Sequence, residues 1–398
     1  MARWGALVGG VLVQLVIGGL YAWSIFGRAL SAPGALGLSR VEAAVPFEVA
    51  IGMIFVGSSI GGRLQDRSSP RVVALAGVVL FAVGHLVASF GTGPGALGWL
   101  VVGYGVVGGF GLGMAYIVPV ALLQKWFPDQ RALVTGLAVG GFGFGAMVTA
   151  PAAHHLVALT PAEPAVAFRA LGLAYLAVGA LGASLLARPP VAVPGPTGGA
   201  AGLTVSQALR TPHWYLLAGT LAVSVTAGIA LISMMASVSV EVAGLTPVAA
   251  AGAVGVLALF NGGGRIVWAA LAQRVGHVPV LGAILVLEGL ALMVLPHVPG
   301  PLLLGLAALV YLCYGGAFGT LPSAAGSTFG LTHAGAIYGL MLVGWSLAGV
   351  AGPLLGSALV GSSGYALAFG VLGAVGLVGA LLPWALGRLG PARWGASS

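Results

Sequence analysis

Twelve apolar segments, each long enough to cross a lipid bilayer, follow one another along the 398 residues of the chain. A helix needs about 20 predominantly apolar residues to span the hydrocarbon core. In lipid every backbone polar group must find its partner inside the protein, so such segments are expected to be α-helices. The sequence therefore predicts an all-α membrane protein with twelve transmembrane helices. The expected spans are 5–28, 43–62, 70–90, 96–122, 131–153, 167–187, 213–236, 247–270, 278–296, 301–322, 334–359 and 364–387.

The low charge content excludes most other classes of protein. Only 6% of the residues are charged, whereas about 25% is usual in soluble domains. The net charge of +8 does not indicate nucleic-acid binding, because the basic residues lie in short loops between apolar segments. No set of nucleophile, base and orienting group is apparent, nor a metal-ligand cluster or a phosphate-binding loop. We therefore expect neither an enzyme nor a cofactor or bound metal.

A proline- and glycine-rich stretch after Arg188 divides the apolar segments into two sets of six. The loop Gly61–Arg67 in the first set resembles Ala270–Arg274 in the second, with Gln273-Arg274 in place of Asp66-Arg67. Such internal similarity is typical of transporters built from two repeated bundles. We expect two pseudo-symmetric six-helix bundles, with boundaries at 1–187 for the first, 188–212 for a cytoplasmic linker and 213–398 for the second.

The distribution of basic residues predicts the orientation. Arg63, Arg67, Arg71 and Lys125 lie in loops on the side that would also carry both termini, and few basic residues lie on the other side. Cytoplasmic loops of membrane proteins are enriched in arginine and lysine. We expect a multi-pass protein of the plasma (cell inner) membrane with both termini in the cytoplasm.

Arg265 is the charge that most narrows the function, because it lies inside the eighth apolar segment with no other charge around it. Placing an arginine at mid-bilayer costs roughly 2.5–3.5 kcal/mol on insertion scales, and arginine does not lose its proton. Asn261 shares its helix face, four residues earlier, and the three glycines between them are expected to keep that face open. This pattern favours capture of a carboxylate by the guanidinium. The alternative is a structural arginine, neutralised by Glu288 or by backbone carbonyls.

Several motifs resemble one transporter family. The Gly61–Arg67 loop is similar to the signature loop of the major facilitator superfamily. Four other features resemble a narrower branch of this superfamily, that of the oxalate/formate antiporters and monocarboxylate transporters. These are the opening run from Arg3-Trp4 to Phe26, Tyr116 followed by Lys125–Asp129, the Asn261–Arg265 spacing, and Tyr338-Gly339-Leu340.

The resemblance implies a site for a carboxylate at the bilayer midplane, between the two bundles. It implies that Arg265 holds the carboxylate and that Tyr116, Tyr314 and Phe318 line the pocket. Tyr314 and Phe318 are four residues apart and share a helix face, and Trp345 is a further candidate for the wall. Packing is the alternative role for these aromatic residues.

Coupling and gating have their own candidates. Glu48 and Glu288 are the acidic residues within the expected spans, and a carboxylate buried without a partner can bind a proton. Their alternative is a structural ion pair or hydrogen bond. Arg28 is expected to attract anions or to pair with Glu42 or Glu48, and direct contact with the substrate is the alternative.

The loop residues Asp66, Arg63, Arg67 and Arg71 suit an ion-pair latch between spans, and the resemblance implies that this loop holds a cytoplasmic gate closed. The alternative is that their positive charge only sets the topology. In animal monocarboxylate transporters an aspartate implicated in proton coupling stands four residues before the arginine. Asn261 occupies that place here and cannot titrate.

The sequence predicts a secondary transporter of a small monocarboxylate such as L-lactate or pyruvate, working by alternating access and proton symport as a monomer. Anion exchange, such as oxalate for formate, is the alternative within carriers. A non-transporting sensor, a channel or a membrane enzyme are the alternatives from other classes. The expected partners are the carboxylate, protons and the lipid bilayer.

Overall fold

The structure is a computed structural model that describes residues 2–32, 34–190 and 202–390. Across these residues it is helical and contains no strand. Eleven helical runs in the described chain are long and apolar enough to cross a membrane. The last, Ala334–Leu389, has 56 residues, more than twice what one crossing of about 20 residues needs. It turns at Gly364, whose φ of 80° is non-helical, so this run contains the last two predicted spans and the all-α fold is confirmed.

Two compact units make up the chain. Unit 1 consists of Met1–Phe127, Phe144–Ala192 and His333–Leu340, and unit 2 of Pro128–Gly143, Val193–Thr332 and Met341–Ser398. Each unit therefore includes a short segment that the linear order of the chain would assign to the other half. The predicted division at 187 and 213 stays a prediction. Of the predicted linker, residues 191–201 lie outside the described residues.

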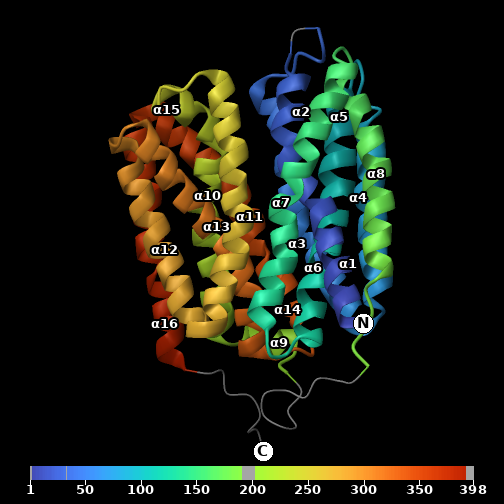
Figure 1. The fold of residues 1–398 in the computed structure, drawn as a ribbon, viewed down its shortest axis with the longest axis vertical. Helices are drawn as coiled ribbons and strands as arrows, with labels where there is room; N and C mark the ends of the chain where they lie inside the picture. The colour runs from blue at the N-terminus through green and yellow to red at the C-terminus, as the bar shows by residue number, and fades with distance from the viewer. Residues whose placement is uncertain (1, 33, 191–201, 391–398) are drawn as a thin grey trace, which may run out of the picture. The chain divides into compact units, whose positions relative to one another are not determined.

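The helices of unit 1 run side by side along their length in Figure 1. Within it α3 packs against α6, α4 packs against α6 and α8, and α1 packs against α6 and α8. Its elements are α1 (Ala2–Ile17), η1 (Gly18–Ala22), α2 (Trp23–Leu30), α3 (Arg40–Arg67), α4 (Pro70–Ala88), α5 (Ala96–Leu100), the π-helical η2 (Val101–Gly108), α6 (Gly109–Trp126), η3 (Pro164–Val166) and α8 (Ala167–Ser184).

Unit 2 is built in the same way. There α10 packs against α15, α11 against α13, and α12 against α13 and α15. Its elements are α9 (Val205–Leu209), α10 (Pro212–Glu241), α11 (Pro247–Val275), α12 (His277–Val294), η4 (Leu295–His297), α13 (Gly300–Phe329), α15 (Val343–Gly379) and α16 (Leu381–Leu389).

Two helices are shared between the units. Helix α7 (Arg131–Leu159) belongs to unit 2 as far as Gly143 and to unit 1 from Phe144 onward. Helix α14 (Ala334–Met341) belongs to unit 1 as far as Leu340. These shared segments supply several of the contacts described below.

Local signals in the sequence fix the ends of the helices. Ser39 and Glu42 form a reciprocal capping box at the start of α3, which satisfies two backbone donors that have no partner within the helix. Thr246 caps α11 and Pro247 follows it as the first helical residue, where its missing N–H costs nothing. Gly276, with φ of 94°, separates α11 from α12.

Candidate functional site

Arg265 lies on α11 and is 0% exposed. Of all the lysine and arginine side chains that the structure describes, it alone is fully buried. The guanidinium does not point outward into lipid. Its charge is held inside the protein, so its partners determine what it can do.

Those partners satisfy the guanidinium only in part. Its Nε donates to Asn261 Oδ1 at 3.4 Å, and its Nη1 donates to the carbonyl of Val139 at 3.3 Å. Both distances are long, since N–H···O bonds are usually 2.9–3.0 Å. Nη2 has no hydrogen-bond partner among the described residues, and no described carboxylate lies within 4.0 Å. The alternative of neutralisation by Glu288 is therefore excluded, whereas one backbone carbonyl does contact the group.

Aromatic rings cover the guanidinium. Its Cζ lies 5.1 Å from the ring centroid of Phe142 and 4.9 Å from that of Phe318. Trp345 packs against both rings, and Tyr314 lies edge-on to Phe318 at 5.3 Å. Cations are attracted to the faces of such rings within about 6 Å. The rings also exclude water, which strengthens any electrostatic contact that the arginine makes.

The structure brings together most of the predicted binding residues. Arg265, Asn261, Tyr314, Phe318 and Trp345 all belong to unit 2, and each is buried. The tight approach of α11 to α13 holds them together, because a Cβ at Gly315 would clash with the backbone of Asn261. This approach requires glycine, as is common where membrane helices pack closely.

The glycines between Asn261 and Arg265 serve packing, so the expectation that they keep the helix face open is wrong. A Cβ at Gly143 of α7 would lie 2.6 Å from Gly262 Cα, and a Cβ at Gly264 would clash with the backbone of Leu312. Gly263, in contrast, has open space beside it. At Gly262 and Gly264, neighbouring helices fill the room that the missing side chains leave.

Tyr116 belongs to unit 1, where it is 0% exposed on α6. Its backbone carbonyl accepts a hydrogen bond from Gln14 Nε2 of α1 at 3.0 Å. Its membership of the carboxylate site stays a prediction.

The coupling candidates differ in burial. Glu288 on α12 is 0% exposed, whereas Glu48 on α3 is only partly buried. Arg28, at the end of α2, is exposed and forms no ion pair with a described acidic side chain. The expected pairing of Arg28 with Glu42 or Glu48 is therefore not found.

Asp66 joins three elements within unit 1. Its Oδ1 lies 3.3 Å from Lys125 Nζ of α6, and its Oδ2 accepts a hydrogen bond from the backbone N–H of Ala336 at 2.9 Å. Ala336 lies in the first turn of α14, where the helix dipole favours a negative charge. Arg67 is exposed and has no such contact among the described residues. Asp66 thus pairs with Lys125, a cation that the predicted latch did not include, and the latch role itself stays a prediction.

Gln273 makes the corresponding contact within unit 2. Its Oε1 accepts a hydrogen bond from the backbone N–H of Ala132 at 3.1 Å, and its Nε2 donates to the carbonyl of Asp129 at 3.0 Å. Ala132 lies in the first turn of α7. The neutral amide of Gln273 therefore accepts a hydrogen bond from the first turn of α7, as the Asp66 carboxylate does from the first turn of α14.

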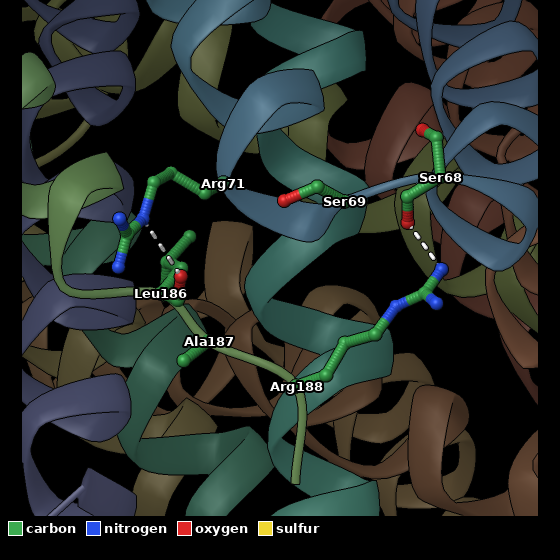
Figure 2. A pocket seen from close by; sticks show the side chains of 6 residues that line it. All are labelled: Ser68, Ser69, Arg71, Leu186, Ala187 and Arg188. Atoms are coloured by element: carbon green, nitrogen blue, oxygen red, sulfur yellow. Dashed lines mark hydrogen bonds between the residues drawn. The ribbon is translucent and has the colours of Figure 1, made fainter.

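A cavity of about 400 Å³ lies at the turn between α3 and α4 in unit 1. Figure 2 shows Arg71 directed at the carbonyl of Leu186, with Nε at 3.4 Å, and Arg188 directed at the carbonyl of Ser68. The two arginines tie the chain after α8 to the α3–α4 turn. The cavity contains none of the predicted binding residues.

Two members of the Arg265 environment were not predicted. Phe142 and the carbonyl of Val139 come from α7, and their proximity depends on how α7 packs against α11. The one signal in the sequence is an aromatic residue set among glycines at 140–145. Such a position is equally typical of simple helix packing.

The comparisons with known proteins agree with this helical architecture. Over 96% of its length the chain superposes on the solved structure of the proton:xylose symporter XylE, covering 95% of that chain with a TM-score of 0.72 at 14% identity. It is 24% identical over 379 residues to the oxalate:formate antiporter of Oxalobacter formigenes, covering 92% of this chain and 87% of that protein. It is 30% identical over 364 residues to human monocarboxylate transporter 11, covering 84% of this chain and 73% of that protein. These two relatives confirm the resemblance to that branch.

A family profile identifies the chain. The profile of the Major Facilitator Superfamily matches residues 12–343 and, a second time, residues 264–397. The matched regions contain Asp66 with its contacts, its Gln273 counterpart and the buried Arg265. With this match and the shared fold, the chain belongs to the Major Facilitator Superfamily.

Proposed function

We propose that the protein is a secondary active transporter of small monocarboxylates such as L-lactate and pyruvate. The observation that carries the proposal is the state of Arg265. Its charge is permanent and fully buried, its two hydrogen bonds are long, and Nη2 lacks a partner among the described residues. A buried charge is costly unless it is paired. A carboxylate from solution would supply the missing charge and accept two parallel hydrogen bonds.

Asn261 suits the recognition of the remainder of the acid. Its Oδ1 accepts from Arg265 Nε, so its side-chain N–H groups are directed elsewhere. An N–H donor beside the guanidinium can bind a 2-oxo or 2-hydroxy oxygen next to the carboxylate. We propose that Tyr314, Phe318 and Trp345 bound the apolar end of the molecule. Tyr116 is proposed as a further contact on the basis of the resemblance.

One cation favours a monocarboxylate over a dicarboxylate. Arg265 is the only fully buried arginine or lysine among the described residues. A second carboxylate brought into the same apolar surroundings would lack a counter-charge, which is strongly unfavourable. Acids with a single carboxyl group therefore fit the surroundings of Arg265 best.

We further propose alternating access with proton symport, by a monomer in the plasma membrane with both termini cytoplasmic. Symport with protons needs no site for another ion. Arg265 is closed off from solvent, so binding requires that the rings over it move apart. Phe142 lies one residue from the point where α7 passes from one unit to the other, which makes it the proposed moving wall.

Exchange of one organic anion for another is the second candidate, because a relative over most of the chain is an oxalate:formate antiporter. Uptake by purified protein in liposomes distinguishes the two. Labelled L-lactate, pyruvate, oxalate and formate are each supplied with and without an inward proton gradient, and with and without internal substrate.

The proposal predicts saturable lactate or pyruvate uptake that the proton gradient accelerates in empty liposomes. Uptake that requires internal anion would indicate exchange instead. Conductance without saturation would indicate a channel, product formation an enzyme, and binding without uptake a sensor.

A further inference from the structure

We propose that Glu288 carries the proton that accompanies the carboxylate. The inference rests on the proposed function, because it assumes that the cargo is an anion bound at Arg265. It identifies the residue that binds the proton, and it gives a reason why the proton and the carboxylate are transported together.

Glu288 is the only aspartate or glutamate in the described chain that is fully buried. Its Oε2 accepts a hydrogen bond from Ser224 Oγ of α10 at 2.9 Å. Its Oε1 has no hydrogen-bond partner among the described residues, and no described cation lies within 4.0 Å. A structural carboxylate inside a protein is normally paired or fully hydrogen-bonded. This one is held by a single hydroxyl, which leaves Oε1 able to take up a proton.

The position of Glu288 links it to the proposed carboxylate site. A Cβ at Gly228 of α10 would lie 2.7 Å from Glu288 Oε1 and also 2.7 Å from the ring of Tyr314. The carboxyl oxygen and the tyrosine ring thus meet in the room that this glycine leaves. Tyr314 packs on Phe318, which covers Arg265. Glu288 therefore lies directly behind the aromatic wall of the proposed site.

No other titratable group of the neighbouring helices neutralises Glu288. Cys313 of α13 is a free, buried thiol, and the Tyr314 ring lies beside Glu288. None of the remaining charged or titratable groups on the packed helices pairs with it or hydrogen-bonds to it. These are His213, Tyr215 and Glu241 on α10, Arg265 and Arg274 on α11, His297 on η4, Tyr311 on α13, Tyr365 on α15 and Arg388 on α16.

The two buried ions give a physical basis for coupling. Without cargo, ionised Glu288 and Arg265 have opposite charges that sum to zero. When a carboxylate binds Arg265, the sum becomes negative unless Glu288 takes up one proton from solution. A net charge in low-dielectric surroundings is unfavourable. The two forms that can change between the outward-facing and inward-facing states are therefore the empty carrier and the carrier loaded with one anion and one proton. Release of both restores the empty form.

The Glu288→Gln variant tests this scheme, because glutamine keeps the hydrogen bond from Ser224 and imitates the protonated acid. When loaded with lactate, the variant has no net charge at these two sites, so it should change between the outward-facing and inward-facing states. When empty, the variant has a net positive charge at these two sites, so it should not change back to the state that faces the substrate. In liposomes we expect counterflow of labelled lactate within about twofold of the unaltered protein, and net uptake driven by a proton gradient at least about tenfold lower.

Two further variants make the result specific. Glu288→Asp keeps a carboxyl group and should retain net uptake. Glu48→Gln removes the partly buried carboxyl of α3 and should leave both assays unchanged. Thermal unfolding in detergent checks that each variant is folded.

Net uptake by Glu288→Gln at the normal rate would overturn the inference, as would loss of counterflow by a folded Glu288→Gln protein. The same holds if Glu48→Gln, and not Glu288→Gln, separates counterflow from net uptake. If the unaltered protein shows neither activity with any monocarboxylate, the proposed function itself fails. That outcome is distinct from a defect confined to the variant.

Discussion

The guanidinium of Arg265 donates a hydrogen bond from Nη1 to the backbone carbonyl of Val139, at 3.3 Å. This contact joins α11 to the part of α7 that belongs to unit 2. The carbonyl is a weaker partner than a carboxylate would be, since charge-assisted bonds from N–H to carboxylate are usually 2.7–2.9 Å. A carboxylate that enters would displace the carbonyl, so binding of cargo and release of α7 from α11 are expected to be linked.

Asn261→Ala should weaken substrate binding without unfolding the protein. A hydrogen bond to a charged group contributes about 1.5–3 kcal/mol, so we expect KM for lactate to rise by roughly tenfold or more. Initial uptake rates over a range of lactate concentrations measure this. Ser233→Ala is the matched control, because among the described residues Ser233 bonds only to the carbonyl of Ala230 in its own helix. An unchanged KM in Asn261→Ala would exclude Asn261 from the site.

Gly143→Ala should separate α7 from α11. The added Cβ would lie 2.6 Å from Gly262 Cα and 3.3 Å from Arg265 Nε. Overpacking of this kind costs about 1–3 kcal/mol, so the thermal unfolding temperature in detergent should fall.

Gly263→Ala is the control for Gly143→Ala, since nothing lies within 4 Å of its Cβ position. Alanine is favoured over glycine in helices by about 0.5–1 kcal/mol, so this variant should be as stable as the unaltered protein or more so. Equal losses in both variants would contradict the close approach of α7 to α11.

Asp66→Ala should destabilise the contact between α3 and α14. It removes the ion pair with Lys125 and the acceptor for the Ala336 N–H. Loss of a side-chain acceptor at a helix N-terminus costs about 0.5–2 kcal/mol. The thermal unfolding temperature and the rate of net uptake should both decrease. Asp66→Asn, which keeps an acceptor oxygen, should be affected less.

Arg67→Ala provides the comparison for Asp66, because Arg67 is adjacent in the loop but exposed. Its effect on stability should lie within about 0.5 kcal/mol. If Arg67→Ala decreases uptake as strongly as Asp66→Ala, the latch depends on the general positive charge of the loop and not on the Asp66 contacts.

The sequence predicted those features that depend on local pattern. Hydropathy alone located the membrane helices, and the position of a single charge in an apolar run identified Arg265 as a buried charge. The spacing of Tyr314 and Phe318 placed both rings on one helix face. These inferences succeed because the period of a helix and the cost of a charge in lipid are independent of the tertiary structure.

The remaining contacts depend on how distant helices pack. Phe142 and Val139 meet Arg265 only because glycines let α7 approach α11. The glycines beside Arg265 looked like cleared space, but whether a neighbouring helix fills such space cannot be read from one helix. Likewise Lys125 and Asp66 are 59 residues apart in the chain, and no local pattern distinguishes Lys125 from the arginines nearby.

Uptake by Arg265→Lys tests the central claim most directly. Lysine keeps the positive charge but lacks the planar fork that holds a carboxylate through two parallel bonds. In liposomes, with thermal unfolding as the check on folding, we predict that lactate counterflow falls by roughly 10- to 100-fold while the variant stays folded. Counterflow at the normal rate and KM in a folded Arg265→Lys protein would contradict capture of the carboxylate by this arginine.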